Sequence, residues 1–170
     1  MVSAHYQTRP SDLLQLLDNP VVELWVARQR HAVVGVLMAL IEGDLDRVMA
    51  DRVAAGERRP RGHLLPQSLA VHAGLEDILR CRVLRVQRLA VHPQRRRQGV
   101  ATRLIASVAD WALSARFDLL GCAYGADPPL LQFWQSVGFL PARCGIRVDP
   151  ASALHSLFML RGLNVRGTAL

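Results

Sequence analysis

Small residues and arginines gather in the run Arg96-Arg97-Gln98-Gly99-Val100-Ala101, which has the residue types of a diphosphate-binding turn. Upstream, residues 83–91 are β-branched and roughly alternating, which predicts a strand. Downstream, apolar residues recur with helical spacing over residues 104–112, which predicts an amphipathic helix. Gly99 and Ala101 therefore fall where that helix begins. Small residues there let free backbone N–H groups approach a diphosphate, and the helix dipole favours its negative charge.

The spacing of this turn is Arg-x-x-Gly-x-Ala, which differs from both the dinucleotide-fold and the Walker-loop patterns. An ordinary strand–turn–helix junction is the alternative interpretation. The turn resembles the acetyl-coenzyme A loop of the GNAT acyltransferase superfamily, whose signature is Arg/Gln-x-x-Gly-x-Gly/Ala. The resemblance implies acetyl-coenzyme A as co-substrate. It also implies two groups of contacts: the backbone of Leu89, Ala90 and Val91 along the acetyl and pantetheine segment, and Arg96, Arg97, Gln98, Gly99, Val100, Ala101 and Thr102 around the pyrophosphate.

Composition indicates one globular domain. The chain has 170 residues, of which 51% are hydrophobic and 21% charged. No apolar stretch reaches membrane-spanning length and no signal-peptide core is present, so we expect a soluble cytoplasmic protein. Cys81, Cys122 and Cys144 are widely spaced, which predicts neither a metal site nor a disulfide framework. We expect each cysteine to pack in the core as a small residue.

The charge of the chain is unusual. The formal net charge is +7, and the sequence contains arginine but no lysine. Between Arg80 and Arg103 there are eight arginines and no acidic residue. A GC-rich genome would explain the missing lysine but not the local absence of acids. The stretch predicts an anionic partner, either the phosphates of coenzyme A or a nucleic-acid backbone.

The order of expected elements predicts the fold class. We expect strands at 2–6, 21–28, 33–41, 83–91, 117–124, 139–144 and 155–161, and helices at about 10–18, 43–55, 64–72, 100–114 and 128–137. This order predicts an α/β fold of the GNAT type, a mixed central sheet with splayed parallel strands and helices on both faces. We expect a single domain over residues 1–170, with a helical, basic insert at about 43–80 before the cofactor strand.

Two departures narrow the resemblance. Many GNAT enzymes carry a tyrosine general acid four residues before the Gly-Phe pair, whereas this chain has Trp134, whose indole cannot supply a proton at neutral pH. The insert is also long for a small acetyltransferase. Both features resemble the acetyltransferase domain of the bacterial tRNA(Met) cytidine acetyltransferases. The resemblance lies in residues 2–6, 59–69, 89–93, 96–102, 124–125, 133–135 and 138–139.

This second resemblance implies acetyl transfer to the exocyclic amine of the wobble cytidine of tRNA(Met), giving N4-acetylcytidine. In that family the module follows an ATP-dependent RNA-helicase module, so we expect tRNA and a helicase module as partners. Arg58, Arg59, Arg61 and Arg95 are the candidate phosphate contacts, although a solvated basic face is the alternative. Pro129 and Ser136 replace residues that the family places near the cofactor. Cofactor binding is therefore better supported than catalysis.

The sequence does not identify a catalytic base. His92, His63 and Asp127 are the main candidates, with His72 and Tyr124 beside them. His92 follows the cofactor strand but also suits a turn, His63 equally suits RNA contact, and Asp127 suits a helix cap.

Two other functions remain open. A stand-alone acetyltransferase for a small amine or a protein N-terminus would share the cofactor loop but predicts an acidic acceptor pocket, against which the arginine-rich insert argues. A module that binds acetyl-coenzyme A or RNA without catalysis would account for Pro129, Ser136 and Trp134.

Overall fold

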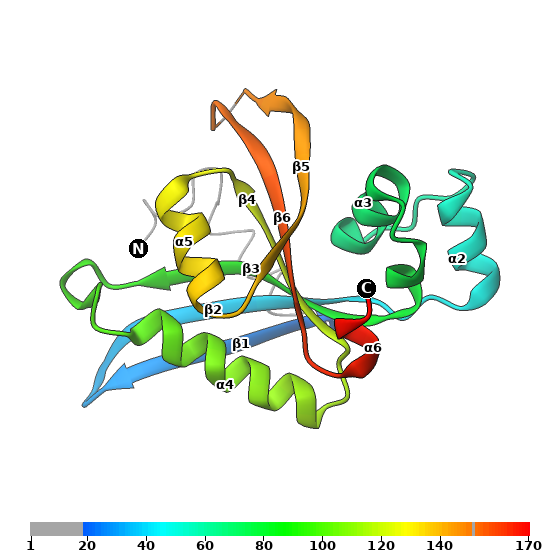
Figure 1. The fold of residues 1–170 in the computed structure, drawn as a ribbon. Coiled ribbons are helices and arrows are strands. Elements are labelled where there is room, and N and C mark those ends of the chain that lie inside the picture. Colours follow the sequence, from blue (N-terminus) through cyan, green and yellow to red (C-terminus); the bar gives the residue numbers. More distant parts are fainter. Residues whose placement is uncertain (1–18, 151) are drawn as a thin grey trace.

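One mixed sheet organises the chain. The computed structural model describes residues 19–150 and 152–170, so the strand expected at 2–6 and the helix at 10–18 lie outside the described residues. The strands are β1 (Val22–Gln29), β2 (Ala32–Gly43), β3 (Arg82–Val91), β4 (Leu119–Gly125), β5 (Leu140–Asp149) and β6 (Leu154–Gly162). Their order in the sheet is β1-β2-β3-β4-β6-β5 (Figure 1). Only the β3–β4 pair among these is parallel.

Helices join the strands. Between β2 and β3 lie α2 (Arg47–Ala54), α3 (Leu64–Ala73) and the 3₁₀ helix η2 (Glu76–Arg80). After β3 come η3 (Pro93–Arg95) and α4 (Val100–Ser114), then α5 (Pro128–Ser136) after β4 and α6 (Val165–Thr168) after β6. The two 3₁₀ helices and α6 were not expected from the sequence, because one or two turns are too short to show a helical period.

Each face of the sheet has its own core. On one face, α4 and α5 pack through Leu104, Ile105 and Trp134 against Leu84 and other strand residues. On the other face, α2, α3 and η2 pack against the sheet through residues that include Val53, Leu65, Leu69, Ile78 and Val83. The prediction of a mixed α/β sheet with splayed parallel strands, helices on both faces and a helical segment before β3 is confirmed. In Figure 1, the α2–α3 segment lies at one end of the sheet and the β3–α4 loop at the other.

The helix expected at 43–55 begins later than predicted. Gly43 still belongs to β2, and Asp44 adopts a left-handed conformation with φ of 55°. The side chain of Asp46 then caps the helix by accepting a hydrogen bond of 2.8 Å from the amide of Met49. The helix therefore starts at Arg47, after its cap.

The expectation for the cysteines was wrong at one position. Cys81 and Cys122 are buried, and burial raises the pKa of both thiols. Cys144 is exposed instead, because it lies on β5, the strand at the edge of the sheet.

Candidate active site

The parallel strands β3 and β4 separate part-way along their length. They pair over Val83–Val86 and Leu119–Cys122 only, in four residue pairs. Beyond that point β3 continues to Val91, and β4 continues to Gly125 on the other side of the opening. The separation leaves a length of each strand without its parallel neighbour.

The backbone of β3 has free hydrogen-bonding groups on the open side. The amide of His92 donates to the carbonyl of Val34 on β2 over 2.9 Å. Because an antiparallel pair alternates between hydrogen-bonded and non-hydrogen-bonded residues, the amides and carbonyls of Leu89 and Val91 point away from β2. These groups face the opening, where an amide-containing chain such as pantetheine can pair with them.

The turn after β3 is shaped for an anion. Gly99 is the N-cap of α4 with φ of 74°, a left-handed conformation that glycine adopts without steric cost. Within the described part of the chain, the amides of residues 97–102 have no hydrogen-bond acceptor. The side chain of Arg103 steadies the turn by donating to the carbonyl of Gln98 over 3.2 Å. Free amides at the start of a fifteen-residue helix, next to exposed Arg96 and Arg97, fit a pyrophosphate.

A β-bulge places two polar side chains at the base of the opening. Arg88 pairs with Met38 and Val86 pairs with Ala39, so Gln87 is an extra residue in β3. Gln87 Oε1 and Arg88 Nε are both buried, and neither has a hydrogen-bond partner among the described residues. Buried polar atoms without partners are uncommon and costly, so these two atoms are candidates for contact with a substrate.

Sequence analysis did not single out Gln87 and Arg88. The signal was present, because two consecutive polar residues interrupt the alternation of β3 where a bulge adds one residue. Leu89 packs into the α4 core, so Arg88 beside it points to the opposite face, the one that α2 and α3 cover.

Two of the candidate bases have other roles in the fold. Asp127 is the N-cap of α5, and its carboxylate accepts a hydrogen bond of 3.4 Å from the amide of Leu130. Tyr124 donates its hydroxyl to the sulfur of Met159 over 2.8 Å. Burial, aided by the charges of Cys122 and Asp127, raises the pKa of Tyr124 to about 12. Tyr124 therefore stays protonated at neutral pH and is a poor base.

The histidines differ in how they are held. His63 Nδ1 accepts a hydrogen bond of 2.9 Å from the amide of Gly43, so the ring proton of neutral His63 lies on Nε2, which can only donate. His92 is exposed, and its imidazole has no hydrogen-bond partner in the described residues. His92 lies between β3 and η3, beside the turn that precedes α4 and about 13 Å along the chain from Arg88. His72 is exposed on α3.

The residues that depart from the family pattern lie around α5. Trp134 is only 6% exposed and packs edge-on against Phe139, with 4.8 Å between ring centroids. Its role is therefore in the core. Pro129 is in the first turn of α5, and Ser136 donates to the carbonyl of Phe133 over 2.6 Å. A cation is present at this end of α5 all the same, because Arg161 of β6 donates to the carbonyl of Val137 over 3.0 Å.

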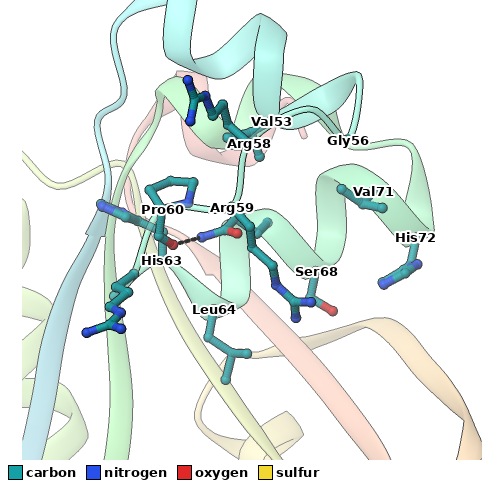
Figure 2. Close-up of a pocket in the computed structure, with 13 residues that line it drawn as sticks. Val53, Gly56, Arg58, Arg59, Pro60, His63, Leu64, Ser68, Val71 and His72 are labelled. Atoms are coloured by element: carbon teal, nitrogen blue, oxygen red, sulfur yellow. Dashed lines mark hydrogen bonds between the residues drawn. The ribbon is translucent and has the colours of Figure 1, made fainter.

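The four candidate RNA-contacting arginines lie in two separate places. Arg58, Arg59 and Arg61 line a groove beside α3, drawn in Figure 2. Arg95 lies in η3 and lines a hollow with Arg30 and His31 of the β1–β2 turn. The structure therefore brings the first three together but not the fourth.

A buried ion pair attaches the helical segment to the sheet. Arg85 Nε lies 2.6 Å from Glu42 Oε1, and the side chain of Glu42 is fully buried. The second oxygen of Glu42 accepts a hydrogen bond of 2.9 Å from the amide of Leu65, in the first turn of α3. His63, the N-cap of α3, makes no side-chain cap bond, so Glu42 from the neighbouring strand satisfies this helix end.

Comparison with known proteins identifies the family. A family model described as GNAT acetyltransferase 2 matches residues 1–116. The chain belongs to the GNAT acetyltransferase family. The predicted GNAT resemblance is thereby confirmed.

Relatives of known name extend the likeness over the full chain. The tRNA(Met) cytidine acetyltransferases TmcA of Nitrosococcus halophilus and Pectobacterium atrosepticum are each 40% identical to it over 170 residues. That of Vibrio cholerae is 38% identical over 95% of the chain. The chain spans only 22–24% of the length of these three relatives.

Solved structures agree on the fold. The ribosomal-protein-S18-alanine N-acetyltransferase of Escherichia coli superposes with a TM-score of 0.63, covering 95% of this chain and 81% of that one at 11% identity. A putative streptothricin acetyltransferase of Bacillus anthracis, solved in complex with acetyl coenzyme A, gives a TM-score of 0.58 over 89% of this chain and 68% of that one, also at 11% identity.

The described residues contain neither a membrane-spanning helix nor a metal-ligand cluster. None of their helices is both long and apolar enough to cross a membrane. They also contain no group of three or more histidine, cysteine, aspartate or glutamate side chains arranged to hold a metal ion.

Proposed function

We propose that this chain is an acetyltransferase domain that transfers the acetyl group of acetyl-coenzyme A to the exocyclic amine of the wobble cytidine of tRNA(Met), giving N4-acetylcytidine. The observation that carries the proposal is the anion-binding turn at Gly99 set directly beside the opening between β3 and β4. The similarity to TmcA proteins over the whole chain supports the choice of acceptor. Residues 1–170 would form one domain, with the insert at about 43–80.

In this proposal backbone groups hold the co-substrate. The amides of residues 97–102 would receive the pyrophosphate, with Arg96 and Arg97 adding positive charge. Leu89 and Val91 would pair with the pantetheine amides along the open side of β3. This pairing directs the thioester toward the base of the opening, where Gln87 and Arg88 lie.

The acetyl group then moves in one displacement. The N4 nitrogen of cytosine forms a bond to the carbonyl carbon, the carbon–sulfur bond breaks, and the proton lost by the amine ends on the departing sulfur. Arg88 Nε would donate to the carbonyl oxygen as negative charge develops there. A guanidinium cannot accept the proton. Because the cytosine amine is nearly non-basic and already uncharged, we assign no histidine as an essential base.

The longer relatives imply a larger assembly. Since the chain spans about a quarter of their length, we propose that it acts beside an ATP-dependent RNA-helicase module in the cytoplasm. That module would present the unpaired anticodon loop, because a base must leave its stack to reach such a site. By itself the chain would bind acetyl-coenzyme A but acetylate tRNA weakly.

Mass spectrometry of tRNA(Met) nucleosides after incubation with acetyl-coenzyme A tests the proposal. We expect N4-acetylcytidine when helicase module and ATP are supplied, little without them, and none with Gly99→Glu. Robust acetylation by the isolated chain without ATP would contradict the need for the helicase. Acetylation of polyamines in place of tRNA would contradict the acceptor.

A further inference from the structure

The groove beside α3 is a second candidate binding site, separate from the opening between β3 and β4. The loop of residues 56–63 forms one wall, and the outer face of α3 forms the other (Figure 2). Its volume is about 520 Å³, within the range of pockets that hold small molecules. Arginine and histidine side chains line it, and its lining in the described chain includes no carboxylate. An anionic ligand fits this charge.

The outer face of α3 carries apolar side chains that do not pack in the core. Leu64 and Val71 lie on this face and are 51% and 48% exposed. Ser68 lies between them at helical spacing, and its hydroxyl accepts a hydrogen bond of 3.1 Å from Arg143 of β5. Leu65 and Leu69, on the inner face, are fully buried in the core between α3 and the sheet. An apolar strip bordered by arginines is complementary to an unpaired nucleotide, which has a flat base and a charged phosphate.

The loop that forms the groove is held in shape. The side chain of Gln67 donates to the carbonyl of Pro60 over 2.6 Å (Figure 2), and Gly62 has φ of 87°. His63 is fixed by the amide of Gly43, which leaves its Nε2–H as a donor. In Figure 2, Arg59 extends from the loop across the outer face of α3. A preformed loop lowers the entropy cost of binding.

The groove also lies close to the opening. The first turn of α3 packs on β4, where Leu65 Cδ1 fills the space that a Cβ on Gly121 would need. Gly121 pairs with Arg85, one residue before the last parallel pair, Val86 with Cys122. The groove is on the other side of the same helix, so about one helix diameter, roughly 10 Å, separates it from the opening.

We propose that this groove binds an unpaired nucleotide of the RNA substrate that neighbours the acetylated one. Its phosphate contacts Arg59 and Arg61, and its base packs on Leu64 and Val71. The inference rests on the proposed function for the identity of the acceptor strand. The groove would then select unpaired RNA over duplex, because a paired base cannot lie on α3.

Fluorescence anisotropy of a labelled unpaired oligoribonucleotide tests the phosphate contacts. With Arg59→Ala/Arg61→Ala in the 170-residue chain we expect about ten-fold weaker binding. The salt dependence of log K should become shallower by about 0.7, because the one phosphate that both arginines contact is no longer neutralised. Arg116→Ala, which removes an exposed arginine just after the C-terminal end of α4, is the matched control and should change affinity less than about two-fold.

The stacking of the base on α3 has a separate test. Leu64→Ser should weaken binding of the unpaired strand about five-fold at every salt concentration without changing the salt slope, because Leu64 offers the base an apolar surface and no charge. Leu113→Ser on α4 is the matched control, since Leu113 is 53% exposed. The proposal is wrong if Leu64→Ser and Leu113→Ser weaken RNA binding equally. It is also wrong if the wild type binds the duplex of the same sequence as tightly as the unpaired strand, or if poly-glutamate displaces the labelled strand as well as unlabelled RNA does.

The two proposals fail differently. If the complete system acetylates tRNA but the groove variants bind unpaired RNA like the wild type, the groove proposal is wrong and the function stands. If the groove variants lose RNA affinity while the wild type acetylates no RNA even with the helicase module, the acceptor assignment is wrong and the groove stands.

Discussion

The β3–α4 turn and the α2–α3 segment both favour phosphate, but they are built from different parts of the chain. At the turn, the proposed binding groups are backbone amides of residues 97–102, and the side chains beside them are exposed. At the groove, the proposed groups are the side chains of Arg59 and Arg61, on a loop held by Gln67. A backbone site fixes its ligand by geometry, whereas a side-chain site adapts to it. That difference suits a constant cofactor on one side and an RNA strand on the other.

The largest expected effect comes from Gly99→Glu. The substitution places a side chain at φ of 74° and a negative charge among the free amides, so we expect no acetyl-coenzyme A binding measurable by calorimetry. Gly56→Glu is the matched control, because Gly56 has φ of 77°, is in the α2–α3 segment and has open space around it. Unchanged cofactor affinity in Gly99→Glu would refute the assignment of the turn.

Glu42→Ala should destabilise the α2–α3 segment more than the β3–α4 turn. Removing one member of a buried ion pair leaves Arg85 uncompensated and the first turn of α3 uncapped, so we expect a loss of about 3–5 kcal/mol in the free energy of unfolding. Hydrogen exchange should increase in α3 more than in α4. Glu42→Leu/Arg85→Met should recover much of the stability, because an apolar pair leaves no buried charge. Equal loss of protection in both helices would contradict the anchoring role.

Arg88→Gln tests the bulge that lies between the regions. We expect kcat to fall about 100-fold, the effect of removing one oxyanion donor, while the acetyl-coenzyme A Kd stays within about two-fold. Arg88→Lys, which retains a donor, should recover part of the rate. His92→Gln should lower kcat by less than about ten-fold, since His92 lies beside the turn and not at the bulge. A larger loss of kcat in His92→Gln than in Arg88→Gln would contradict the assignment of Arg88 as the oxyanion donor.

Asp127 gives the smallest effect. Asp127 is the N-cap of α5, so Asp127→Ala should lower the free energy of unfolding by about 1 kcal/mol, measured by thermal unfolding. Asp127→Asn should leave it nearly unchanged, because asparagine also caps a helix. A catalytic base would behave otherwise, because asparagine cannot accept a proton at neutral pH. Loss of acetyl transfer in a stable Asp127→Asn protein would restore Asp127 as the base.

Most elements of the fold could be predicted from periodicity alone. The strand at 83–91, the helix at 100–114 and the turn between them follow from apolar spacing and the small residues at Gly99 and Ala101, and the structure places them as expected. These features are local, so residues close in sequence determine them. Boundaries were harder to predict, as the late start of α2 at Arg47 shows, because a cap side chain decides them.

The sequence by itself determined the turn between β3 and α4, the class of sheet and the basic character of the segment before β3, since each depends on neighbouring residues. The tertiary structure decided which distant residues meet. It paired Glu42 with Arg85, placed Arg95 away from Arg58, buried Trp134 and exposed Cys144. It also turned Gln87 and Arg88 into a bulge at the base of the opening. Such features depend on strand register and on which face of the sheet each helix covers, and neither is encoded by local spacing.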